Sequence, residues 1–202
     1  MVTLYQIKPA FQGLLRPLTR ALAAHGVSAN QVTIAALLLS VAGGTLIASY
    51  PTARWPLLLL PPLLLLRMAL NAIDGMLARE HDMKTALGAL LNELGDVISD
   101  AALYLPLALV PGVSSLLVVV FTVLALVGEM TGVVAVQIGA SRRYDGPLGK
   151  SDRALLLGAL GLVLGLGVSP GAWLQIVLIV GCVLLVFTIV NRARRALAEA
   201  AP

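Results

Sequence analysis

The chain has 202 residues, of which 59% are hydrophobic and 12% are charged, and its mean hydropathy is +0.95. Soluble domains carry about 25% charged residues, so this composition excludes an ordinary soluble enzyme or a disordered chain and predicts an integral membrane protein. The single cysteine, Cys182, excludes a disulfide within the chain and a cysteine cluster for zinc. The net charge of +4 would suggest nucleic-acid binding in a soluble protein, but its distribution, described below, indicates membrane topology instead.

The N-terminal segment, residues 1–28, is predicted to form an amphipathic helix at the membrane surface. Apolar residues recur at helical spacing from Leu4 to Leu22, while basic residues follow another face. A helix with this pattern lies in the headgroup region of a bilayer. We expect Pro9 or Pro17 to interrupt it; a merely solvated leader is the alternative.

Residues 29–202 are predicted to form one all-α transmembrane domain with six helices. Six apolar stretches come near the roughly 20 residues that a helix needs to cross a bilayer. Backbone groups in lipid must find partners within the protein, and the stretches are too long for barrel strands, so each is predicted to be a helix. The predicted spans are Asn30–Ser49, Trp55–Ala78, Ala86–Leu109, Ser114–Gly139, Ala154–Val168 and Trp173–Val190.

The basic residues predict the orientation of these spans. Nearly all Lys and Arg lie near the chain ends or in every second connection, whereas the alternate connections contain only Arg54. By the positive-inside rule the basic side is the cytoplasm. Both termini are therefore expected on the cytoplasmic side of a plasma or bacterial inner membrane, and no nucleic acid is expected as a partner.

Acidic and amide side chains lie inside two predicted spans, where each charge costs several kcal/mol unless it has a use. These residues are Asn71 and Asp74 in the second span, and Asn92, Glu93, Asp96 and Asp100 in the third. At about 100° per residue, each set follows one side of its helix. Because a short polar connection joins the two spans, we expect antiparallel neighbours whose polar sides face each other near the cytoplasmic surface.

Two kinds of cation can neutralise such a cluster. Arg67, within the second span, can pair with Asp100 or with Glu129 of the fourth span. Carboxylate and amide oxygens without His or Cys are hard ligands, which favour Mg²⁺ or Mn²⁺. The polar set therefore predicts a site for one or two divalent ions; a bundle held together by protonated acids is the alternative.

The spacing of these residues resembles the signature of the CDP-alcohol phosphotransferase family. The segment reads Asn71-x-x-Asp74-Gly75-x-x-Ala78-Arg79, eight residues, Gly88, three residues, Asn92, three residues and Asp96. In the family four Asp stand where this chain has Asn71, Asp74, Asn92 and Asp96, so two acids are replaced by amides. The stretches Ser28–Thr33 and Gly149–Asp152 also resemble the family.

This resemblance implies displacement at a phosphorus of a CDP-linked alcohol, commonly CDP-diacylglycerol, by the hydroxyl of a second alcohol, with release of CMP. It implies that Asp96 is the general base and that Asn71, Asp74, Asn92 and Asp96 bind the metal. Because Glu93 adjoins Asn92 and Asp100 lies one turn further along, we expect these two acids to join the metal ligands and compensate for the amides. The residues implied in nucleotide binding are Asn30, Thr33, Asp74, Gly75, Ala78, Arg79 and Gly88. The family resemblance also implies a homodimer.

The acceptor alcohol is expected to bind the basic connection before the fifth span. Its cations are Arg142, Arg143, Lys150 and Arg153. They favour a phosphorylated polyol such as glycerol 3-phosphate, although the same cations can serve topology or hold anionic lipid.

Two other functions are alternatives. Because Asn71 and Asn92 are amides, the chain can be an inactive paralogue that binds CDP-lipid without turning it over. A small transporter is less favoured, because the outer halves of the spans contain almost no polar groups to continue a pathway.

Overall fold

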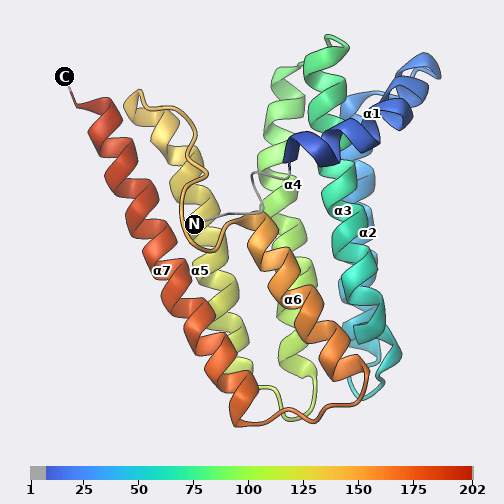
Figure 1. Cartoon of the computed structure of the whole chain (residues 1–202), viewed down its shortest axis with the longest axis vertical. Helices are drawn as coiled ribbons and strands as arrows, with labels where there is room; N and C mark the ends of the chain where they lie inside the picture. The colour runs from blue at the N-terminus through green and yellow to red at the C-terminus, as the bar shows by residue number, and fades with distance from the viewer. Residues whose placement is uncertain (1–7, 202) are drawn as a thin grey trace.

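The computed structural model describes residues 8–201, which form a bundle of long helices without strands (Figure 1). The elements in chain order are α1 (Lys8–Ala24), α2 (Ala29–Ser49), α3 (Trp55–Glu80), α4 (Ala86–Tyr104), the 3-10 helix η2 (Leu105–Leu109), α5 (Ser115–Val134), the 3-10 helix η3 (Ala135–Ile138), α6 (Lys150–Gly165) and α7 (Ala172–Ala200). The predicted all-α fold is confirmed for these residues.

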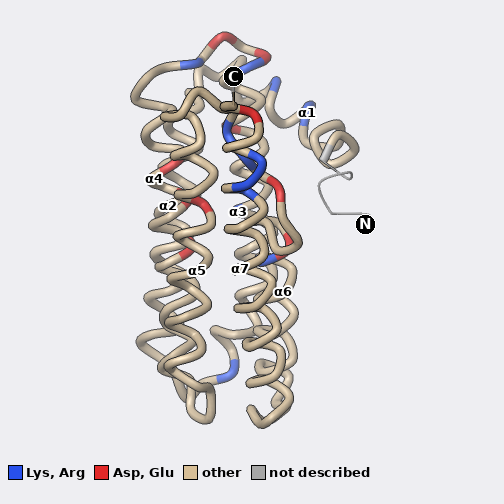
Figure 2. The backbone as a smooth tube through the Cα atoms, turned by 90° about the vertical axis from the view of Figure 1, so that its left-hand side faces the viewer, with Lys and Arg blue, Asp and Glu red and all other residues tan. Residues whose placement is uncertain are grey.

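The helices alternate in direction, so the polar connections gather at one end of the bundle, which we call the α1 end (Figure 1). It carries α1, the C-terminus of the chain and the connections 81–85 and 139–149. In Figure 2 most charged residues lie in this half. The connections at the opposite end contain one charged residue, Arg54.

Four of the helices are long and apolar enough to cross a bilayer. They are Ala29–Ser49, Trp55–Glu80, Ser115–Ile138 and Ala172–Ala200. The other two predicted spans, α4 and α6, are not among them. The helix α4 carries three carboxylates. The helix α6 has 16 residues and is about 24 Å long at 1.5 Å per residue, which is shorter than the hydrocarbon core of about 30 Å. The described residues therefore define an integral membrane protein, and the expected count of six spans stays a prediction.

Several predicted boundaries were wrong. The helix α6 begins at Lys150 rather than Ala154, and α7 continues to Ala200 rather than ending at Val190. The helix α1 runs through Pro17 without interruption. Leu4 and the rest of residues 1–7 lie outside the described part of the chain, and the division at residue 28 stays a prediction.

Two caps position the helix starts beside the site. The Ser28 side chain accepts from the Gln31 backbone N–H at 3.3 Å, and the Gln31 side chain accepts from the Ser28 N–H at 2.8 Å. This reciprocal pair satisfies backbone donors that have no partner in the first turn of α2. At the start of α4 the Thr85 hydroxyl accepts from the Gly88 N–H at 2.9 Å. Both helices thus begin at fixed residues of the α1 end.

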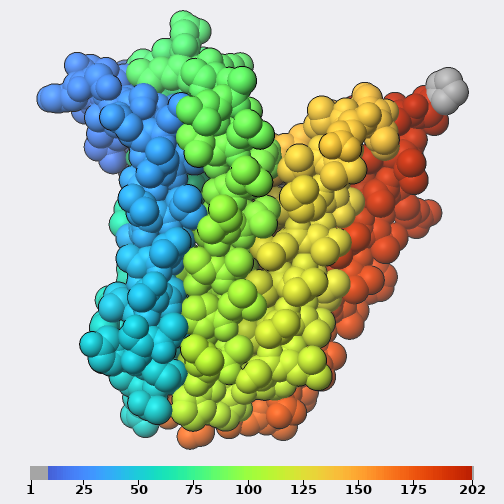
Figure 3. Space-filling view, turned by 180° about the vertical axis from the view of Figure 1, so that it is seen from behind, coloured from blue at the N-terminus to red at the C-terminus, as the bar shows by residue number. Residues whose placement is uncertain are grey.

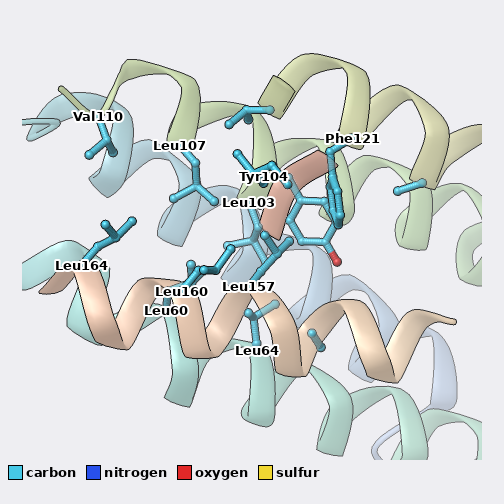
Figure 4. Packing of buried hydrophobic residues seen from close by; sticks show 14 of the residues in the cluster. Leu60, Leu64, Leu103, Tyr104, Leu107, Val110, Phe121, Leu157, Leu160 and Leu164 are labelled. Carbon is cyan, nitrogen blue, oxygen red and sulfur yellow. The ribbon is translucent and has the colours of Figure 1, made fainter. Parts of the chain in front are cut away.

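The largest apolar core among the described residues comes mainly from the parts of the helices that lie away from the α1 end. Figure 4 shows part of this core. Tyr104 and Phe121 pack edge to face in it, with ring centroids 6.3 Å apart. A Cβ atom placed on Gly44 would lie 1.8 Å from the Ala102 carbonyl oxygen, so α2 and α4 approach as closely as a glycine allows. Close packing in this half leaves the polar residues together in the other.

Candidate active site

The α1 end contains a cavity of about 990 Å³. Figure 3 shows the surface notched here, between the connection that joins α3 to α4 and the C-terminal part of α5. The predicted site residues that line the cavity are Asn30, Thr33, Asn71, Asp74, Gly75, Ala78, Arg79, Gly88, Asn92, Asp96, Arg142, Arg143 and Lys150. Glu93, Asp100 and Arg153 are absent from its lining.

The polar sides of α3 and α4 face each other, as expected, but the two helices are not tightly packed neighbours. The helix α2 contacts both of them, and α3 packs instead against α6. Side chains bridge the space between α3 and α4, where the Asn71 amide donates to Asp96 Oδ1 at 3.2 Å. This separation opens the cavity between the two polar sides.

Asp74 forms a hydrogen bond with a residue of α2. Its Oδ2 accepts from the Thr33 hydroxyl at 2.9 Å, and the residue is 5% exposed. Thr33 lies in the first turns of α2, whose start the Ser28 cap fixes. The cap therefore positions the side chain that holds Asp74.

Asp96 lies among three side chains of the α1 end. Its Oδ1 accepts from the Lys150 ammonium and from Asn71, and Arg67 donates to its backbone carbonyl at 3.1 Å. Its Oδ2 has no hydrogen bond from residues 8–201, and neither has the Asn92 side chain. One carboxylate oxygen and one amide thus remain for a ligand in the cavity.

Asp100 is held by two arginines one turn deeper. Arg67 contacts one of its oxygens at 2.5 Å and Arg153 the other at 2.8 Å, and Asp100 is 1% exposed. The predicted pairing of Arg67 with Asp100 is confirmed. The second partner, Arg153, was missed because it was assigned to a connection instead of the first turn of α6.

Glu129 and Glu93 are also paired with arginines. Arg153 contacts Glu129 at 2.9 Å, and Arg192 and Arg142 each contact it at 3.5 Å. Arg142 contacts Glu93 at 2.6 Å. Burial disfavours the charge on Arg142, but the hydrogen bond to Glu93 and the nearby carboxylates raise the pKa of its guanidinium above the ordinary value.

Ion pairs and a hydrogen bond join the connection 139–149 to α7. Arg143 contacts Asp145 at 2.8 Å and Glu199 at 2.5 Å, and Arg195 contacts Asp145 at 2.6 Å. The Arg192 guanidinium also donates to the Asp145 carbonyl at 3.0 Å. Sequence reasoning missed the contacts to α7, because Arg143 and Glu199 lie 56 positions apart and Arg195 and Asp145 lie 50 apart.

Two of the predicted glycines have specific neighbours. A Cβ on Gly88 would lie 2.6 Å from Asn30 Oδ1, so Gly88 allows α2 and α4 to meet at the cavity edge. A Cβ on Gly75 would lie 3.0 Å from Arg79 Nη2, so the Arg79 guanidinium lies over this glycine. Arg79 thereby stays along the cavity wall.

The oxygen ligands of the cavity fit a hard divalent ion. No group of three or more His, Cys, Asp or Glu side chains suited to a metal is present within residues 8–201. Asp74 and Asp96 nevertheless offer two carboxylates beside two amides. Mg²⁺ commonly binds through one or two carboxylates together with waters and substrate phosphates, so this smaller set suits an ion that a phosphate ligand completes.

The fold and the cavity define a helical membrane protein with a polar cavity at one end of its bundle. The model of the CDP-alcohol phosphatidyltransferase family matches residues 26–190, and the chain belongs to this family.

Two curated bacterial proteins are similar in sequence. The Escherichia coli inner membrane protein YnbA is 47% identical over 198 residues, covering 97% of both chains. An uncharacterized protein of Aquifex aeolicus is 36% identical over 96 residues, covering 48% of this chain and 46% of its own length.

Solved structures of Mycobacterium tuberculosis phosphatidylinositol phosphate synthase (PgsA1) are similar in fold. The structure with CDP-DAG bound has a TM-score of 0.75 at 22% identity and covers 92% of this chain and 96% of its own. The complex with manganese and citrate also has a TM-score of 0.75 at 22% identity, covering 92% and 91%.

Proposed function

We propose that this chain transfers a phosphatidyl group from CDP-diacylglycerol to the hydroxyl of a polar alcohol and releases CMP. The observation that carries the proposal is the cavity at the α1 end, where the family's signature positions on α3 and α4 meet Asn30 and Thr33 of α2. The CDP-DAG bound in a fold relative, PgsA1, supports the choice of donor.

The lining of the cavity suits an amphiphilic donor. Apolar side chains from α1 and α3, namely Phe11, Leu65 and Met68, share the cavity with the polar set, and acyl chains can lie against them. Arg79 would bind the diphosphate with its planar guanidinium. Asn30, Thr33, Asp74, Gly75, Ala78 and Gly88 complete the proposed nucleotide site.

A Mg²⁺ or Mn²⁺ ion held by Asn71, Asp74, Asn92 and Asp96 would neutralise the diphosphate and the charge developing on departing CMP. The manganese complex of PgsA1 supports a divalent ion of this kind. Glu93 and Asp100, expected as compensating ligands, already bind arginines, and we leave them out of the proposed set.

Asp96 is the proposed general base. Its Oδ2 faces no hydrogen-bond donor among residues 8–201 and would take the proton of the acceptor hydroxyl. The deprotonated oxygen of the acceptor then forms the new P–O bond while the bond between the phosphatidyl phosphorus and CMP breaks. Asn71, which donates to the other oxygen of Asp96, orients the carboxylate.

The acceptor would enter beside the connection 139–149. Arg142, Arg143 and Lys150 line the cavity there and favour a phosphorylated polyol such as glycerol 3-phosphate. Arg153 is fully buried between Asp100 and Glu129, so its proposed role is to position α6 rather than to touch the acceptor.

We also propose that α2 to α7 all cross the membrane, with the α1 end and the site at the cytoplasmic surface. The basic residues of that end support this orientation. The exposed apolar side chains of α1, Leu14 and Leu18, support its placement among the lipid headgroups. A homodimer is proposed from family membership alone.

The test supplies purified full-length protein with CDP-diacylglycerol, Mn²⁺ and single alcohols, and measures CMP. We expect release that depends on one acceptor class, with glycerol 3-phosphate and other phosphorylated polyols ahead of choline. Binding of CDP-diacylglycerol without CMP from any acceptor would identify an inactive paralogue. Passage of ions across proteoliposome membranes, without CMP release, would identify a transporter.

A further inference from the structure

We propose that the site binds a single divalent ion and that the Lys150 ammonium supplies the second positive charge, beside Asp96. This inference rests on the proposed function and specifies its metal requirement. It follows from how the acids near the cavity are paired.

Most acids near the cavity are already committed to partners within the chain. Glu93 and Asp100 bind arginines, and so do Glu129 and Asp145, which line the cavity. The Asp152 carboxylate accepts from the Gly149 N–H at 3.0 Å and caps α6. Among the described residues, the cavity-lining acids that cap no helix and have no arginine within 3.5 Å of the carboxylate are Asp74 and Asp96.

Arg67 lies near the Asp96 carboxylate but contacts it only weakly. Arg67 Nη2 lies 3.7 Å from Asp96 Oδ1, but the same guanidinium bonds Asp100 at 2.5 Å and the Asp96 carbonyl at 3.1 Å. Its main partners are therefore elsewhere. The close cation at the Asp96 carboxylate is Lys150.

Lys150 is held at this position by its own helix. It is the first residue of α6, where Asp152 caps the turn and the fully buried Arg153 anchors it to α4 and α5. Its side chain is 26% exposed and lines the cavity. The ammonium thus faces both the carboxylate and the space in which a substrate phosphate would lie.

The presence of an amide at Asn71 favours a lysine beside Asp96 over a second metal ion. As an amide it donates to Asp96 Oδ1, the oxygen that Lys150 also contacts. An amide adds no negative charge, so two carboxylates and one ammonium leave the site with one net negative charge. One divalent ion reverses that charge and suits a diphosphate, whereas two ions would lack carboxylates to hold them.

The first test counts Mn²⁺ bound to the purified full-length protein with CDP-diacylglycerol, from the electron paramagnetic resonance signal of the free ion. We expect one Mn²⁺ per chain and the spectrum of an isolated ion. Two ions per chain, or the spectrum of a coupled pair, would overturn the inference even if CMP is released. No bound Mn²⁺ together with no CMP from any acceptor would overturn the proposed function as well.

The second test uses Lys150→Met, with Lys84→Met as the matched control. Lys84 lines the same cavity and has no ion pair within residues 8–201. For a separation of about 6 Å in a water-like dielectric, removing the Lys150 charge should tighten Mn²⁺ binding about tenfold. The same change should lower kcat at least about tenfold, while Lys84→Met leaves Mn²⁺ affinity unchanged. Unchanged or weaker Mn²⁺ binding in Lys150→Met would refute the assignment.

Discussion

Replacing Arg153 with Met should destabilise the bundle substantially. Its guanidinium is fully buried and bridges Asp100 at 2.8 Å and Glu129 at 2.9 Å, so it joins α4, α5 and α6. Removing one partner of a buried ion pair costs about 3 to 5 kcal/mol. Asp100 keeps Arg67 and Glu129 keeps weaker contacts, so we expect the lower end, about 3 kcal/mol.

The assay is equilibrium unfolding of the purified protein in mixed micelles with increasing SDS, followed by helical circular dichroism. The matched variant adds Asp100→Asn to Arg153→Met. The second change removes one of the two carboxylates that Arg153 contacts. We expect the double variant to be more stable than the sum of the single losses predicts, by at least about 1 kcal/mol. A loss below about 1 kcal/mol for Arg153→Met, or strict additivity, would refute the bridging role.

Three further variants test separate parts of the account. Asp96→Asn should lower CMP release at least about 1,000-fold while CDP-diacylglycerol binding, measured by calorimetry, persists; retained turnover would remove Asp96 as the base. Glu93→Gln should leave Mn²⁺ stoichiometry unchanged and raise the KM for the acceptor several-fold, since its partner is Arg142; a lost ion would make Glu93 a ligand instead. Gly44→Ala should destabilise the bundle by about 1 to 3 kcal/mol, because the new Cβ meets the Ala102 carbonyl; an unfolding curve like that of the wild type would show that α2 and α4 can separate freely.

The order of the long helices and the polar sides of α3 and α4 could be predicted, because both depend on local periodicity. Arg67 and Asp100 could be paired for the same reason, since each lies on the polar side of its helix and these two sides face each other. The start of α6 could not be predicted. A hydropathy pattern marks where residues become apolar at Ala154, whereas the capped helix begins four residues earlier, at Lys150.

The partners of the other arginines depend on contacts between distant parts of the chain. Arg192 meets Glu129 across 63 positions, and Arg142 meets Glu93 across 49. No local spacing encodes such pairs. The short connection between α3 and α4 also predicted direct packing, but the packing of α2 against both helices keeps them apart and leaves room for the cavity.

The most direct measurement of the central claim follows both products of one reaction. Purified protein receives CDP-diacylglycerol, Mn²⁺ and glycerol 3-phosphate, or another alcohol from the panel, and lipids are identified by mass spectrometry while CMP is quantified. The account predicts a new phospholipid that contains the acceptor, formed in equal amount to CMP and absent with Asp96→Asn. Intact CDP-diacylglycerol after incubation with every acceptor would contradict it.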